Sequence, residues 1–175
     1  KVHSLEFRGY ASILHYDTDS KLNFDDRDEQ LQIYSLSHLY NNRNDFSLKT
    51  TFDLNVSKLQ YIFAERSANN YTNRIYKLTS ESEYRILPNL ITKNSFQVLA
   101  NYTVYDFEDI ISQIKSFSYR QLNLKDSTIY FLNDHISFEV YGEAKIYEQG
   151  EFNNNAFTIN PIFYNVDKSA FFQVN

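Results

Sequence analysis

The chain of 175 residues contains no cysteine, methionine or tryptophan, and only three glycines and two prolines. The lack of cysteine excludes disulfide bonds and cysteine-ligated metals. No stretch approaches the roughly 18 consecutive apolar residues that mark a candidate transmembrane helix, so a helical membrane span is excluded. The net charge of −5 argues against binding to nucleic acid, because a nucleic-acid-binding surface must be basic to replace phosphate counterions.

Aromatic residues are abundant, with 15 tyrosines and 15 phenylalanines. Aromatic and β-branched residues favour strands because they cover a pleated, half-buried surface well. The segment from Ile136 to Ile146 alternates strictly between apolar and polar residues. A period of two places the apolar residues on one face of an extended strand and the polar residues on the other.

The same alternation recurs along the whole chain and predicts one domain, residues 1–175, with about eight long strands. The expected strands are His3–Tyr16, Glu29–Tyr40, Phe46 to about Phe63, Arg74–Leu87, Ser95 to about Asp106, Ser116–Leu132, His135–Glu148 and, more weakly, Ala156–Val166. A ninth strand is expected to begin within Ser169–Val174. The sixth strand has a fault near Lys125–Asp126, a bulge or a turn. Only Phe107–Gln113 has the character of a helical turn.

The connections alternate in length. Asn41–Asp45, Pro88–Asn94 and Asn133–Asp134 are compact, whereas the segments 17–28, 64–73, 107–113 and 149–155 are longer or more polar. In an up-and-down meander, alternate connections lie at the same end of the sheet. The sequence therefore predicts tight turns at one end and longer loops at the other, an asymmetry typical of outer-membrane barrels.

Long strands with one apolar and one charged face resemble a Gram-negative outer-membrane β-barrel of an uncharacterised family. Asn101–Asp109 and Ser116–Gln121 are similar in style to segments of such barrels. The resemblance implies an all-β fold, an antiparallel up-and-down meander that forms a β-barrel or part of one. It also implies location in the outer membrane and a role as a pore, a transport component or a structural subunit of an envelope assembly.

The two faces of such a barrel give two sets of candidate residues. The lipid-facing candidates are Leu5, Phe7, Ile13, Phe52, Leu54, Val56, Val98, Val104, Phe138, Val140 and Ile146. The candidates that line the lumen are Glu6, Arg8, Lys49, Asp53, Glu81, Glu83, Arg85, Arg120, Glu139, Glu143 and Lys145. Aromatic girdles at the membrane boundary are expected from tyrosines near strand ends, namely Tyr16, Tyr40, Tyr61, Tyr105 and Tyr147.

No catalytic, cofactor or metal site is expected. Glu81 with Glu83, or Glu139 with Glu143, supplies two carboxylates on one face, as acid–base chemistry requires, but such pairs are common in solvated sheets. The histidines lack metal-binding spacing. The acidic segment 17–28 contains an Asp-x-Asp pattern without the glycine and glutamate of a calcium-binding EF-hand loop, so we expect a solvated loop.

Alternation alone leaves open which face lies inside. The alternative is a soluble lipocalin-like barrel or sandwich, secreted or periplasmic, that binds a small ligand or a glycan. In the membrane interpretation, the partners are membrane lipid and either other envelope proteins or further strands of a larger barrel. The closing residues Phe172–Asn175 lack a terminal aromatic residue, so we expect either a partial chain or one portion of a larger barrel.

Overall fold

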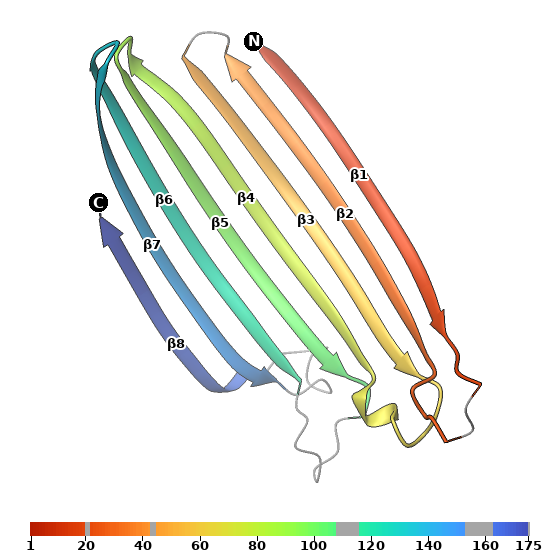
Figure 1. The fold of residues 1–175 in the computed structure, drawn as a ribbon. Coiled ribbons are helices and arrows are strands. Elements are labelled where there is room, and N and C mark those ends of the chain that lie inside the picture. The colour runs from red at the N-terminus through yellow and green to blue at the C-terminus, as the bar shows by residue number, and fades with distance from the viewer. Residues whose placement is uncertain (20–21, 43–44, 108–115, 153–162, 175) are drawn as a thin grey trace.

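The computed structural model describes residues 1–19, 22–42, 45–107, 116–152 and 163–174. These residues form a single sheet of eight strands (Figure 1). The strands are β1 (Val2–Tyr16), β2 (Arg27–Asn42), β3 (Phe46–Tyr61), β4 (Tyr71–Leu87), β5 (Leu90–Tyr105), β6 (Phe117–Asn133), β7 (Ile136–Phe152) and β8 (Phe163–Val174). A short 3-10 turn, Ser67–Asn69, precedes β4. The all-β fold predicted from the sequence is confirmed.

Each strand pairs antiparallel with the next one in the chain, in the order β1 to β8. The predicted up-and-down meander is therefore confirmed. Long, regular ladders form because apolar and polar residues alternate with few interruptions and because both prolines lie outside the strands or outside the described residues. The sheet does not close, so among the described strands β1 and β8 are its two edges.

Short and long connections alternate as predicted. β2, β4 and β6 each finish at one end of the sheet and are followed by short connections, whereas β1, β3 and β5 finish at the other end and are followed by longer ones (Figure 1). We call these the turn end and the loop end. The turn after β6 is fixed by Asn133, whose side-chain oxygen accepts hydrogen bonds from the backbone nitrogens of His135 and Ile136, both at 2.9 Å.

Three sequence expectations need correction or fall outside the described residues. Residues 156–162 of the expected eighth strand lie outside the described residues. The rest of it and the expected ninth strand belong to one strand, β8, because Phe163–Val174 pairs with β7 apart from one irregularity. The expected fault near Lys125–Asp126 is absent, since both residues pair regularly with β5 and β7. The irregularity of β6 lies instead at its end, between Phe131 and Asn133. The proposed helical turn falls almost entirely outside the described residues.

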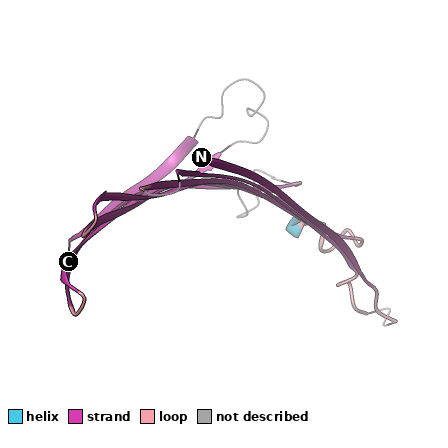
Figure 2. Cartoon of the chain, turned by 90° about the horizontal axis from the view of Figure 1, so that it is seen from above, coloured by secondary structure: helices cyan, strands magenta, loops and turns pink. Residues whose placement is uncertain are grey.

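The sheet forms a single arched layer (Figure 2). Among the described residues, no second sheet and no α-helix packs against either face. No helix in that part of the chain has the length and hydropathy needed to cross a bilayer. Both broad surfaces of the sheet are therefore open to contact with something else.

Candidate functional site: the two faces of the sheet

One face of the sheet is apolar. Residues paired across antiparallel strands lie on the same face, so the register traces each face from strand to strand. Phe7 pairs with Leu36, and the row continues through Phe52, Leu78, Val98, Leu122 and Ile146. All eleven residues predicted to face lipid lie on this side, which we call the apolar face. The other side is the charged face.

The apolar face is solvent-exposed, and it lies on the convex side of the arched sheet. Leu5 is 72 % exposed, Phe7 67 % and Val140 59 %. Along β4, the exposed Arg74, Tyr76 and Leu78 alternate with half-buried residues of the charged face. In an arched sheet, side chains splay apart on the convex side and crowd together on the concave side. The exposure pattern therefore indicates that the apolar face is convex. Exposed apolar surface on this scale marks a protein or membrane interaction site.

The apolar residues form a band that crosses the strands obliquely. On β1 the band runs from Leu5 to Ile13, and on β7 it runs from Ile136 to Ile146. When the band is traced through the register from β1 to β7, its midpoint moves seven residues toward the turn end over six strand-to-strand steps. With about 3.3 Å per residue and about 4.7 Å between strands, this drift corresponds to strands tilted by roughly 40° from the normal of the band. Strands of membrane barrels tilt by about 35–45°.

The charged face carries ten of the eleven residues predicted to line a lumen. Opposite charges there are matched across strands. Asp53 lies 3.2 Å from the Lys77 ammonium and accepts a hydrogen bond of 2.7 Å from Ser35. Lys93 pairs with Glu83 at 3.5 Å. Cross-strand pairs of this kind stabilise a sheet modestly, and they leave a water-compatible surface.

A shallow hollow of about 480 Å³ lies on the charged face near the turn end. Small polar side chains, among them Ser47, Ser95 and Ser127, line it together with charged side chains, namely Lys49, Glu81, Glu83, Lys93, Lys125 and Asp126. The hollow therefore combines short polar residues with a nearly balanced ring of charge. Such a surface suits water and small polar solutes.

The carboxylates considered as acid–base pairs in the sequence form contacts with other side chains of the sheet. Glu143 accepts a 2.8 Å hydrogen bond from Tyr141 and lies 3.5 Å from Lys125. Glu139 accepts a hydrogen bond of 2.6 Å from Ser127. Glu139 and Glu143 thus each have a local partner of their own. Among the described residues, no group of three or more histidine, aspartate or glutamate side chains is placed to hold a metal ion.

Arg120 is the predicted lumen residue that the structure moves to the other face. It pairs in register with Ala100 and Glu148, and it shares the parity of Leu122 on the apolar face. Its guanidinium contacts the Glu148 carboxylate at 2.8 Å. Glu148 was expected at a strand end, without a face assigned. Sequence alternation around Ser116–Gln121 is too weak to set the parity of Arg120.

The expected aromatic girdle is also mostly wrong. Tyr16, Tyr61, Tyr105 and Tyr147 lie on the charged face, and only Tyr40 lies on the apolar face. The tyrosines that do border the apolar band include Tyr34, Tyr76 and Tyr102. Tyr76 and Tyr102 meet edge-on, with ring centroids 6.3 Å apart. The position of a tyrosine near a strand end therefore did not predict which face of the sheet it lies on.

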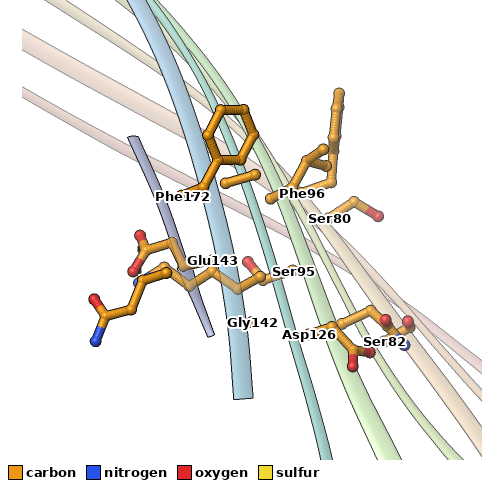
Figure 3. Close-up of a pocket in the computed structure, with 13 residues that line it drawn as sticks. Ser80, Ser82, Ser95, Phe96, Asp126, Gly142, Glu143 and Phe172 are labelled. Atoms are coloured by element: carbon orange, nitrogen blue, oxygen red, sulfur yellow. Dashed lines mark ion pairs between the residues drawn. The ribbon is translucent and has the colours of Figure 1, made fainter. Parts of the chain in front are cut away.

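A polar patch interrupts the apolar face on its central strands. It surrounds a hollow of about 510 Å³ lined by Ser80, Ser82, Asn94, Asp126 and Gly142, with Phe96 and Phe172 beside it (Figure 3). The Asp126 carboxylate accepts hydrogen bonds from Thr92 at 3.1 Å and Thr128 at 3.4 Å. These donors partly satisfy a charge on an otherwise apolar side.

Gly9 and Gly142, two glycines of the apolar face, should tolerate an added side chain to different degrees. A Cβ at Gly142 meets no atom within 4 Å, whereas one at Gly9 touches the rings of Phe7 and Tyr34 at 3.6 Å. We expect Gly142→Val to fill the hollow without loss of stability. We expect Gly9→Val to be destabilising, because its γ-methyl groups extend beyond a Cβ that already contacts both rings. Chemical denaturation of both variants checks this. Equal destabilisation would show that the hollow is already filled.

Comparison with known family models, curated proteins and solved structures found no match. Function must therefore be argued from the two faces of the sheet.

Proposed function

We propose that this chain is an outer-membrane β-barrel protein, or contributes strands to one, with a non-catalytic role as a pore, a transport component or a structural subunit of an envelope assembly. The observation that carries this proposal is the oblique apolar band on the convex face, opposite a face of matched charges. A bilayer covers such a band completely, and the charged face then lines water.

The length of the strands supports the same function. A membrane-spanning strand needs about 9–11 residues, and β1 to β7 have 15 to 17 residues each. The excess places strand ends beyond the hydrocarbon region. Because lipid cannot satisfy backbone groups, the edges of the sheet must be paired inside a membrane. In the assembled protein, β1 and β8 therefore contact further strands or each other.

The role of the charged face depends on how many strands form the closed ring of the assembled barrel. Eight strands alone leave an interior that side chains nearly fill, so a ring of this chain by itself should conduct ions poorly. The sheet arches only gently (Figure 2), which favours a wider ring with additional strands. A wider ring would leave the hollow lined by Lys49 and Glu81 open to solutes.

Expression and fractionation test the proposal. We expect the chain to partition with membranes, and to show a strand-dominated circular dichroism spectrum in detergent but not in detergent-free buffer, because the apolar face needs a covering. The measurement is the spectrum and the sedimentation state with and without detergent. Recovery as a folded, water-soluble monomer that binds a small ligand or glycan would contradict the proposal and favour the soluble β module.

A further inference from the structure

The apolar face carries cations at one border only. Among the described strand residues, all its lysines and arginines lie toward the loop end, as Lys58 on β3, Arg74 on β4, Arg120 on β6 and Lys168 on β8. We call these four residues the basic belt. Every other strand lysine or arginine in the described part of the chain lies on the charged face.

The basic belt follows the slope of the apolar band. Through the register, Lys58 lies in the row of Ile13, whereas Lys168 lies in the row of Gly9, closer to the turn end. The belt thus drifts in the same direction as the band when the sheet is crossed from β3 to β8. If the band is level with the membrane plane, the cations lie along its border on the loop-end side, with Lys168 farthest from the band.

The belt has excess positive charge. Glu148 is the one carboxylate within it, at 2.8 Å from Arg120 and 3.9 Å from Lys168. Among the described residues, Lys58 and Arg74 form no ion pair. The next acid on this face, Asp28, already contacts His15 at 2.6 Å. Four cations and one carboxylate leave a surplus that attracts anions.

Two tyrosines lie beside the belt on β4 and β5. Tyr102 lies directly opposite Arg74, and Tyr76 lies one position nearer the band on that face. Tyrosine rings favour the level of lipid headgroups because one end is apolar and the other is polar. Along β4 the order Leu78, Tyr76, Arg74 toward the loop end matches the order of chemistry met on leaving the hydrocarbon core of a bilayer.

We propose that the basic belt binds the phosphate groups of anionic membrane lipids at the loop end of the sheet. This inference rests on the proposed membrane location. Guanidinium groups match phosphate geometry with paired donors, and lysines act as point charges. The partner is a lipid headgroup because the cations border the apolar band, so that one lipid places its phosphate on the belt and its acyl chains on the band.

The experiment compares two variants of equal charge change in reconstituted vesicles. The belt variant is Lys58→Gln with Arg74→Gln, and the matched control is Lys49→Gln with Arg85→Gln on the charged face. Spin-labelled phosphatidylglycerol and phosphatidylcholine report which lipid contacts the protein. We expect the original chain and the control to select phosphatidylglycerol. The belt variant should lose about fivefold selectivity for each cation removed, corresponding to ~1 kcal/mol per cation near a charged membrane surface.

The outcomes separate this inference from the proposed function. If all three proteins insert but none selects phosphatidylglycerol, or if control and belt variants lose selectivity equally, the belt does not bind lipid phosphate and the membrane location stands. If the original chain does not insert into the vesicles, the proposed membrane location is wrong, and the belt proposal fails with it. Selectivity that free inorganic phosphate abolishes at constant ionic strength would also overturn the lipid assignment.

Discussion

Val98→Arg should abolish membrane assembly of the chain, whereas Gln97→Arg should leave it assembled. The two residues are neighbours on the central strand β5, but Val98 lies on the apolar face between Leu78 and Leu122, and Gln97 lies on the charged face. An arginine in contact with the middle of a bilayer costs about 2–4 kcal/mol, whereas the same residue facing a lumen is tolerated.

The paired design removes the usual ambiguity of a charged substitution. Both variants add one arginine to the same strand, so the net charge changes equally. Assembly is measured as the fraction of protein recovered in washed membranes, and folding as the strand signal in detergent. If Gln97→Arg is the more damaging variant, the charged face is the buried one. If neither variant affects recovery in membranes, the apolar face does not contact lipid.

Much of the fold could be predicted because alternation is a local signal. Apolar and polar residues alternate over ten or more positions in Ile136–Ile146. This alternation predicted both the strand and its two faces correctly. The alternation of tight turns with long loops then fixed the meander. These features depend only on neighbouring residues, so no tertiary contact was needed to predict them.

Where the alternation is weak, the sequence could not show on which face of the sheet a residue lies. Arg120 follows Phe117, Ser118 and Tyr119, a stretch in which neither parity is clearly apolar. Its face became known only from its pairing with Ala100 and Glu148. The girdle tyrosines failed for a similar reason, because a tyrosine suits either face of a strand and its distance from the strand end gives no parity.

The oblique band and the basic belt depend on the register between strands, which a single sequence does not supply. Lys58 and Lys168 are 110 residues apart in the chain, and no local pattern relates them. The antiparallel ladders place them at one border of one face. The sequence therefore predicts the elements and most of their faces, whereas the structure is needed to predict how the faces combine across the sheet.

Proline substitutions on β1 should reveal whether this edge is paired in the assembled protein. Successive backbone N–H groups of an antiparallel strand point to opposite neighbours, so one of Ala11 and Ser12 donates toward β2 and the other points outward. We expect both Ala11→Pro and Ser12→Pro to block assembly, because an outward N–H in a membrane must also be paired. An unsatisfied backbone group there costs several kcal/mol.

Valine variants at the same two positions are the controls, because valine resembles proline in size but keeps the N–H and favours a strand. Both valine variants should assemble. The measurement is recovery in washed membranes together with the strand signal in detergent. If one proline variant assembles as well as its valine control, β1 is a free edge, since only the donor toward β2 is then required. Because that free edge would leave backbone groups exposed to lipid, such a result would exclude a closed ring through β1.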